Sequence, residues 1–226
     1  SRYIGNVRGV NEVGGLVGRG KAKIDQSYSR GTVIGQTYVG GLVGRPDSGF
    51  IVNNSYSQEN VTAYYAVGGL VGGIVSSNNI IVLNSYSSSK ITNASASPAG
   101  GLIGYVLSSS INVTNSYWDI NASGRNTSAG GSGKTTSEMF NQATYTGWDF
   151  TNIWEQTAPS ASYPSSQWRS SLCGPIGCSP PASKLSSETR LWIRNFIWIC
   201  LSIVAAIYFI LVVRWYKNYN RRNRNA

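Results

Sequence analysis

Four carboxylates in the C-terminal half are the residues best suited to acid and base chemistry: Asp119, Glu138, Asp149 and Glu155. A pair of such carboxylates on opposite sides of a sugar bond is the machinery of glycoside hydrolysis. Three of the four directly follow a tryptophan, and this recurrence is better explained by a role in closing a repeated fold. The sequence also contains no histidine, which is the commonest general base. We therefore expect no catalytic site and no enzymatic activity.

Phosphate and metal chemistry are not indicated either. The run from Gly131 to Thr135 approaches a phosphate-binding loop, but Ser128 stands where the first glycine is required and no apolar strand leads in. Calcium-binding repeats need an aspartate at one shared position of each unit, whereas Asp25, Asp47 and Asp119 share no position. The sequence therefore predicts no cofactor and no metal.

The cysteines suggest covalent bonding rather than metal binding. Cys173 and Cys178 bracket a four-residue Gly-Pro-Ile-Gly loop and are a candidate disulfide in an extracellular environment. Two thiols without a histidine or a further nearby cysteine cannot complete a closed zinc shell. Cys200 falls in an apolar segment, where we expect a buried free thiol.

Six Asn-x-Ser/Thr sequons precede that apolar segment, and none follows it. If the host glycosylates asparagine, these sites would give the preceding region a coat of glycans. The candidate asparagines are Asn53, Asn60, Asn93, Asn112, Asn121 and Asn126.

Internal repetition is the strongest indication of the fold. The sequence Val-Gly-Gly-Leu-Val-Gly occurs three times and a variant occurs once, at spacings of 26, 28 and 32 residues. These copies begin at Val13, Val39, Val67 and Ala99. A second motif, Asn-Ser-Tyr or Gln-Ser-Tyr, alternates with the first. Its copies begin at Gln26, Asn54, Asn84 and Asn115.

The repeats predict stacked β-structure. Short apolar stretches between Gly, Asn and Ser are typical of short strands and tight turns. Because no single unit has a core, successive units must stack, and the same motif position must then face the same environment. We predict an all-β fold, a right-handed parallel β-helix or related β-solenoid, in which paired glycines permit close backbone approach. Its interior ladder is predicted to be Leu16, Leu42, Leu70 and Leu102.

These motifs resemble the GLUG-motif repeats, which are named for their Gly-Leu-Val/Ile-Gly core. Such repeats occur in large surface adhesins and, outside the catalytic domain, in some surface peptidases. The resemblance covers residues 1–168 and includes Trp118-Asp119, Gly147-Trp148-Asp149-Phe150 and a closing Tyr163-Pro164. It departs from the pattern at 165–167, where Ser-Ser-Gln replaces an expected apolar residue. The resemblance implies an extracellular array, and adhesion follows only by analogy.

The C-terminal region predicts a membrane anchor. Eighteen residues from Phe196 to Val213 carry no charge, and at ~1.5 Å per residue they would span about 27 Å, close to the hydrocarbon core of a bilayer. Five basic residues and no acid follow this run, which accounts for half of the net charge of +10 and favours a cytoplasmic C-terminus. No basic stripe suited to nucleic acid appears elsewhere.

The predicted organisation has five parts. They are a β-repeat array truncated at its N-terminus (1–118), a terminal capping segment (119–168), a Ser/Pro/Gly-rich linker (169–190), a single transmembrane α-helix (191–213) and a basic cytoplasmic tail (214–226). The opening residues match the interior of a later repeat, so we expect more repeats before Ser1.

The leading functional hypothesis is a membrane-anchored cell-surface stalk or adhesin whose N-terminal side is extracellular. Its partners would be the lipid bilayer and surface glycans or proteins of another cell or of the matrix, with self-association open and nucleic acid excluded. A first alternative is a non-catalytic spacer and anchor for a surface peptidase or glycosidase whose catalytic domain lies upstream. A second alternative is a carbohydrate-binding surface module that uses exposed Tyr and Trp.

Overall fold

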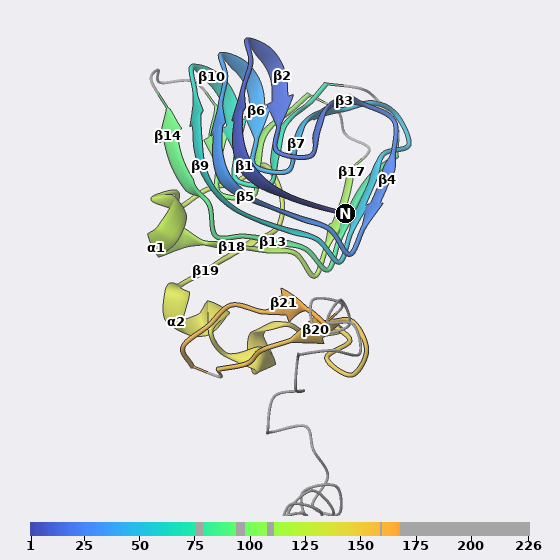
Figure 1. The fold of residues 1–226 in the computed structure, drawn as a ribbon, viewed down its shortest axis with the longest axis vertical. Coiled ribbons are helices and arrows are strands. Elements are labelled where there is room, and N and C mark those ends of the chain that lie inside the picture. The colour runs from blue at the N-terminus through green and yellow to red at the C-terminus, as the bar shows by residue number, and fades with distance from the viewer. Residues whose placement is uncertain (76–78, 94–97, 108–110, 159, 168–226) are drawn as a thin grey trace, which may run out of the picture. The chain divides into compact units, whose positions relative to one another are not determined.

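Strands of successive repeats lie side by side and parallel in the computed structural model of the chain (Figure 1). The structure describes residues 1–75, 79–93, 98–107, 111–158 and 160–167. Each repeat forms one coil, and equivalent strands of the coils pair into four parallel sheets. The prediction of an all-β parallel solenoid is therefore confirmed, with four coils in the described residues.

Each of the first three coils contains four strands, and the fourth contains five. The first coil contains β1 (Arg2–Arg8), β2 (Asn11–Gly14), β3 (Val17–Gly20) and β4 (Lys23–Asp25). The second contains β5 (Tyr28–Ile34), β6 (Thr37–Gly40), β7 (Val43–Pro46) and β8 (Ile51–Asn53). The third contains β9 (Tyr56–Ala63), β10 (Tyr65–Gly68), β11 (Val71–Ile74) and β12 (Ile80–Leu83). The fourth contains β13 (Tyr86–Ser87), β14 (Lys90–Asn93), β15 (Ala99–Gly100), β16 (Ile103–Val106) and β17 (Ile111–Thr114).

One of the four sheets matters most for the site described below, and we call it the tyrosine sheet. It runs in the order β1-β5-β9-β13, with β14 also pairing with β9. Two further strands, β18 (Tyr117–Asp119) and β19 (Ser132–Lys134), continue it beyond β13. A tyrosine starts the strand in coils two to four and again in β18, so Tyr28, Tyr56, Tyr86 and Tyr117 occupy one register position.

The leucine of the first motif forms a ladder through all four coils. The amide of Leu16 donates to the carbonyl of Leu42, Leu42 to Leu70, and Leu70 to Leu102, at 2.9 to 3.0 Å. Leu42, Leu70 and Leu102 are fully buried in one cluster, and the half-buried Leu16 packs against it. The four leucines therefore face a single interior.

The glycine pair of the same motif lies where backbones of adjacent coils meet. A Cβ built on Gly41 would lie 2.2 Å from the carbonyl oxygen of Gly69, and one on Gly69 would lie 2.2 Å from that of Gly101. Neither oxygen can move away, because it belongs to the neighbouring coil's backbone. Only glycine fits this position, which explains the recurrence of the pair.

The second motif forms a corner. Its first residue has a left-handed backbone, with φ between 44 and 47° at Gln26, Asn54, Asn84 and Asn115, a conformation that Asn adopts more readily than most residues. The serine that follows links the coils: Ser55 Oγ donates to its own coil at Asn53 and accepts the amide of Ser27 at 3.1 Å. This geometry accounts for the Asn-Ser part of the motif.

The segment after β18 has two parts. Residues 127–134 continue the stacking, because the amide of Gly101 donates to Thr127, the amide of Ala129 donates to Ile103 and β19 pairs with β18. We call residues 135–167 the flank module, because they lie along the tyrosine sheet rather than beyond the last coil (Figure 1). The short elements after β18 are α1 (Ile120–Ser123), α2 (Thr136–Met139), η1 (Gln142–Thr144), β20 (Trp154–Glu155) and β21 (Ser165–Ser166).

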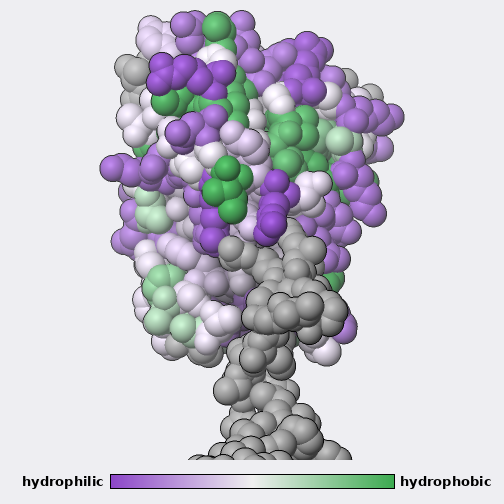
Figure 2. All heavy atoms as spheres, in the orientation of Figure 1, coloured by the Kyte–Doolittle hydropathy of each residue, from purple (hydrophilic) through white to green (hydrophobic). Residues whose placement is uncertain are grey.

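The described residues belong to one compact unit, Ser1–Arg169. On the described part of the face in Figure 2, apolar residues form several separate groups among polar ones. None of the described helices is long and apolar enough to cross a membrane. The predicted linker, transmembrane helix and tail, 169–226, lie outside the described residues.

One acidic side chain points into the solenoid. Glu59 in β9 is 3% exposed, and a Cβ built on Gly15 would lie 3.1 Å from its Oε1. Burial raises the pKa of Glu59 to about 7, and the nearby hydroxyl of Ser29 opposes that rise. The carboxyl group therefore gains a proton well above the pH at which an exposed glutamate does.

The leucine ladder predicts a strong effect of a buried charge. Leu70→Asp should lower the free energy of unfolding by at least about 3 kcal/mol, because an unpaired carboxylate would replace a fully buried side chain. Leu107→Asp is the matched control, since Leu107 is 69% exposed and the same change there should cost less than about 0.5 kcal/mol. Chemical denaturation measures both, and equal effects would contradict a shared interior.

The buried glutamate predicts a pH dependence of stability. The folded chain holds the proton of Glu59 up to about pH 7, whereas an ordinary glutamate releases it near 4.5. The free energy of unfolding should therefore fall as the pH rises through this window. Glu59→Gln cannot ionise, so its stability relative to the unsubstituted chain should increase between about pH 5 and about pH 8. A stability difference that is the same at both pH values would rule out the buried titration.

Candidate binding cleft beside the tyrosine sheet

The tyrosines of the repeats form a stack. The rings of Tyr28 and Tyr56 have centroids 4.9 Å apart and planes within 7°, and those of Tyr56 and Tyr86 are 5.0 Å apart and within 8°. All three side chains are fully buried. Hydrogen-bonded strands lie about 4.8 Å apart, so in-register coils bring equivalent rings to stacking distance.

The flank module covers this stack with aromatic side chains. Trp154 lies 6.0 Å from Tyr56 and 6.1 Å from Tyr86, and Trp148 packs 4.3 Å from Trp154 between ring centroids. Two hydrogen bonds fix the contact: Tyr86 Oη donates to the carbonyl of Pro164 at 2.7 Å, and Trp148 Nε1 donates to that of Asn115 at 2.8 Å. The module is thus attached through the solenoid's own repeated residues.

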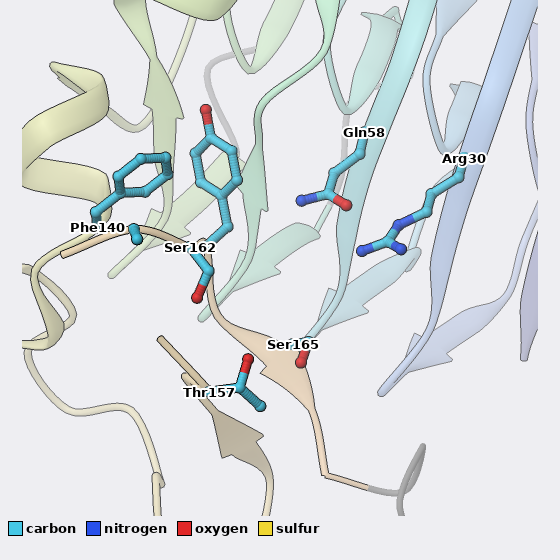
Figure 3. A pocket seen from close by; sticks show the side chains of 8 residues that line it. Arg30, Gln58, Phe140, Thr157, Ser162 and Ser165 are labelled. Atoms are coloured by element: carbon cyan, nitrogen blue, oxygen red, sulfur yellow. The ribbon is translucent and has the colours of Figure 1, made fainter. Parts of the chain in front are cut away.

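A cleft of about 340 Å³ opens where the flank module meets β5 and β9 (Figure 3). Arg30 and Gln58, which are neighbours in register, extend into it from the tyrosine sheet. The facing wall belongs to the flank module. Its lining includes Phe140, Thr157, Ser162, Tyr163 and Ser165.

Arg30 is held by aromatic contacts. Its guanidinium carbon lies 5.4 Å from the ring centroid of Tyr28 and 5.7 Å from that of Tyr56. Cation–π contacts of this kind attract the guanidinium to the rings and leave its positive charge available to a further partner. Ion pairs among the described residues use other cations, namely Arg19, Arg45 and Lys134. The cleft therefore contains a positive charge that no described carboxylate pairs.

Hydroxyl groups near the cleft are not acidic. Burial raises the pKa of Tyr86 well above its usual value, and the charge of Arg30 opposes this rise. Burial and a hydrogen bond to Asp119 also raise the pKa of Tyr163. Gln58 Nε2 donates to Tyr86 Oη at 3.1 Å. These tyrosines stay protonated and act as hydrogen-bonding groups rather than as nucleophiles or bases.

Three of the four carboxylates considered for catalysis accept hydrogen bonds that stabilise local structure. Asp119 is fully buried, caps α1 by accepting from the amide of Ala122 at 2.8 Å, and accepts from Tyr163 Oη at 2.6 Å. Glu138 forms a capping box with Thr135 at the start of α2, and these hydrogen bonds lower its pKa.

The other two acidic residues, Asp149 and Glu155, belong to the flank module. Asp149 accepts from the amides of Thr151 and Asn152, and the bonds from Asn152 lower its pKa. Glu155 lies in β20, where it pairs with Ser165 of β21. Within the described residues, no group of three or more His, Cys, Asp or Glu side chains could hold a metal ion.

The sequon asparagines differ in their surroundings. The side chains of four are exposed, namely Asn60, Asn112, Asn121 and Asn126. Asn53 is half-buried, and its Nδ2, the atom that a glycan would occupy, donates to Asp25 Oδ1 at 3.1 Å. Asn93 ends β14. Cys173 and Cys178 lie outside the described residues.

The sequence reasoning missed Arg30 and Gln58. Each occurs once, at the outward position two residues after the tyrosine of its coil, where the first coil has Ile4. A register alignment of the repeats would have identified this position as variable. It would not have revealed the facing wall, which comes from residues 140–165 and depends on how the flank module folds back.

Parts of the chain are similar to known proteins, although no known family model matches it. The chain is 38% identical over 108 residues to a protein of Evansella cellulosilytica named "Putative Gly-rich membrane protein", a stretch that covers 46% of this chain and 12% of that protein.

A solved structure is also similar. The crystal structure of "a putative immunoglobulin A1 protease" from Bacteroides ovatus matches with a TM-score of 0.56 and 25% identity, covering 74% of this chain and 57% of that one. The chain thus spans less than two thirds of either relative, so the activity of each whole protein does not transfer with the similarity.

The hydrogen bonds of Tyr86 predict how firmly the flank module is attached. Tyr86→Phe removes a buried hydroxyl that donates to Pro164 and accepts from Gln58, which should lower the free energy of unfolding by about 1–3 kcal/mol. Tyr3→Phe is the control, because the hydroxyl of Tyr3 also donates to a carbonyl but in an exposed position. Denaturant titration compares the two, and an equal loss would contradict the attachment.

Proposed function

We propose that this chain is the membrane-anchored part of a cell-surface protein, in which the solenoid presents a binding surface and a C-terminal helix holds it in the bilayer. The observation that carries the proposal is the stacking of four equivalent coils in register, an architecture that offers an extended lateral surface. The similarity to a protein named as a Gly-rich membrane protein supports the membrane setting.

Several finer features belong to the same proposal. The repeats are of the GLUG-motif type and wind in the right-handed sense. Residues 191–213 form the transmembrane helix, 169–190 the linker and 214–226 the cytoplasmic tail. Exposed sequons such as Asn60 and Asn112 carry glycans where the host adds them, and Cys173 pairs with Cys178.

Adhesion is the role that we favour for this surface. Its partners are glycans or proteins of another cell or of the matrix, and contact between helices in the membrane would add self-association. Three of the four carboxylates with catalytic potential, those of Asp119, Glu138 and Asp149, accept hydrogen bonds in caps and a turn, which favours a non-enzymatic role for the described residues.

A second candidate function is that of a spacer within a larger surface enzyme. The similarity to a crystal structure named as an immunoglobulin A1 protease favours it, because that protein contains the same fold over 57% of its chain. In this case the catalytic domain lies upstream, and the solenoid holds it away from the membrane. Both functions require the same topology.

Topology gives the direct test. When the full chain, tagged after Ala226, is expressed in cells, protease added outside should digest the repeats and leave a short membrane fragment with the tag. Five basic residues follow the charge-free run 196–213, whereas Glu188 partly offsets Lys184, Arg190 and Arg194 before it, and this difference gives the expected orientation. Protected repeats with a digested tag would overturn the surface function.

A variant tests the anchor itself. Ile203→Lys combined with Ile207→Lys places two charges in the predicted span, at a cost of roughly 3 kcal/mol each for membrane insertion. The repeats should then leave the membrane fraction. Ile203→Leu combined with Ile207→Leu is the matched control and should remain there. Membrane retention of the lysine variant would contradict a span at 191–213.

A further inference from the structure

The cationic cleft beside the tyrosine sheet has the features of a ligand site that the stacking of the coils does not require. Arg30 Nε is shielded from solvent and has no hydrogen-bond partner among the described residues. Its coil neighbours in register, Ile4 and Gln58, are uncharged, so no repeated motif calls for an arginine here. A buried donor that is left unpaired costs free energy, which a ligand acceptor would restore.

The geometry of Arg30 suits a carboxylate. The stacked rings of Tyr28 and Tyr56 hold the guanidinium, so its fork of N–H donors is fixed before a ligand arrives. Such a fork pairs with a carboxylate through two parallel hydrogen bonds. A doubly charged phosphate would find one cation in the lining, whereas a carboxylate is neutralised by it.

The remaining lining suits hydroxyl groups. Thr157 and Ser165 offer hydroxyls from the flank module, and Ser162, whose hydroxyl bonds the backbone of Ala158, lines the cleft beside them (Figure 3). Gln58 uses its Nε2 to bond Tyr86, which leaves its carbonyl oxygen as an acceptor toward the cleft. This alternation of donors and acceptors matches a ligand that carries several hydroxyls around one ring.

Size and shape favour one sugar unit. The volume of about 340 Å³ is at the lower end of the range for small-molecule pockets, ~300–1,000 Å³. Two rings, Phe140 and Tyr163, line the cleft and pack edge to face with centroids 4.9 Å apart. A pyranose can place C–H groups against such rings, whereas an extended peptide would need a longer groove and apolar side-chain pockets.

We propose that this cleft binds a carboxylated sugar, whose carboxylate pairs with Arg30 and whose hydroxyls bond to Gln58 and to the flank module. The inference rests on the proposed function as a surface protein and names the ligand class of that surface. Arg30 selects a negatively charged ligand, and the hydroxyl groups of the flank module select a sugar. The ligand therefore belongs to the class of acidic glycans.

Paired ligands test the proposal on the full chain in detergent. The probes are the methyl glycosides of glucuronic, galacturonic and N-acetylneuraminic acid, with the neutral methyl glucoside and galactoside as controls. In calorimetric titrations, at least one acidic sugar should bind at least tenfold more tightly than the neutral sugars, and added salt should weaken it. Failure of all acidic sugars to bind, or equal binding of neutral ones, would overturn the proposal.

Variants assign the effect to the cleft. Arg30→Gln should reduce the affinity for the acidic sugar at least tenfold, to the level of the neutral ones. Arg8→Gln is the matched control, because it removes the same charge from an exposed position of the same sheet and should leave the affinity unchanged. Arg30→Lys keeps the charge without the fork and should fall between the two.

The outcomes separate this inference from the proposed function. Near-ultraviolet circular dichroism verifies that each variant is folded, and the comparison of acidic with neutral sugars needs no variant at all. Undiminished binding by folded Arg30→Gln would refute the site. Preferential binding of a short peptide through its C-terminal carboxylate would refute the sugar assignment. The protease experiment on cells does not depend on Arg30, so an inward-facing array with an intact sugar site would overturn the surface function alone.

Discussion

The spacing between hydrogen-bonded parallel strands, about 4.8 Å, is the constraint on which this structure depends. It sets the distance between successive coils, and each repeated residue type is one that this distance accommodates. Gly41 and Gly69 are glycines because the backbone of the adjacent coil leaves no room for a Cβ. Leucine recurs because each copy extends the same interior. Tyrosine recurs because rings held at this spacing stack without further adjustment.

The strand spacing also determines the geometry of one wall of the cleft. The stacked tyrosines have the Arg30 guanidinium beside them, 5.4 Å from the centroid of Tyr28 and 5.7 Å from that of Tyr56, and Trp154 of the flank module packs against the same stack. The flank module in turn supplies the second wall, and the bond from Tyr86 to Pro164 ties the two walls together. One wall of the cleft is therefore built by the repeated coils of the tyrosine sheet. The other wall is built by the flank module, which is not repeated.

Repetition also determines how much could be inferred from the sequence. The coil, the leucine ladder and the position of the glycines could be predicted, because four copies of a motif must satisfy one environment. The left-handed corner at Asn54 and Asn84 could have been inferred from the preference of Asn for that backbone. These features are local or shared, so a periodic sequence reveals them.

The features that could not be predicted lie mainly in the flank module, whose sequence is not repeated. Trp148 and Trp154 were expected to close the last coil, but their rings pack against Tyr56, Tyr86 and Tyr117 along the side of the array. The sequence gives no register for this contact, since its partners lie as many as 98 residues apart, as for Tyr56 and Trp154. Glu59 was also missed, because an acidic residue in a strand is normally read as exposed.

The length of a coil has a consequence for how such an array can change. A repeat of 26 to 32 residues advances the solenoid by only about 4.8 Å, whereas the same residues in an α-helix would cover about 40 Å. Adding repeats is thus an inefficient way to gain height above a membrane. Each added coil instead contributes one more outward row to every sheet, and where the flank module does not cover that row, its residues are free of the packing that fixes the interior. Gain or loss of one repeat would therefore mainly add or remove one row of surface residues on each sheet, with little effect on the height of the array.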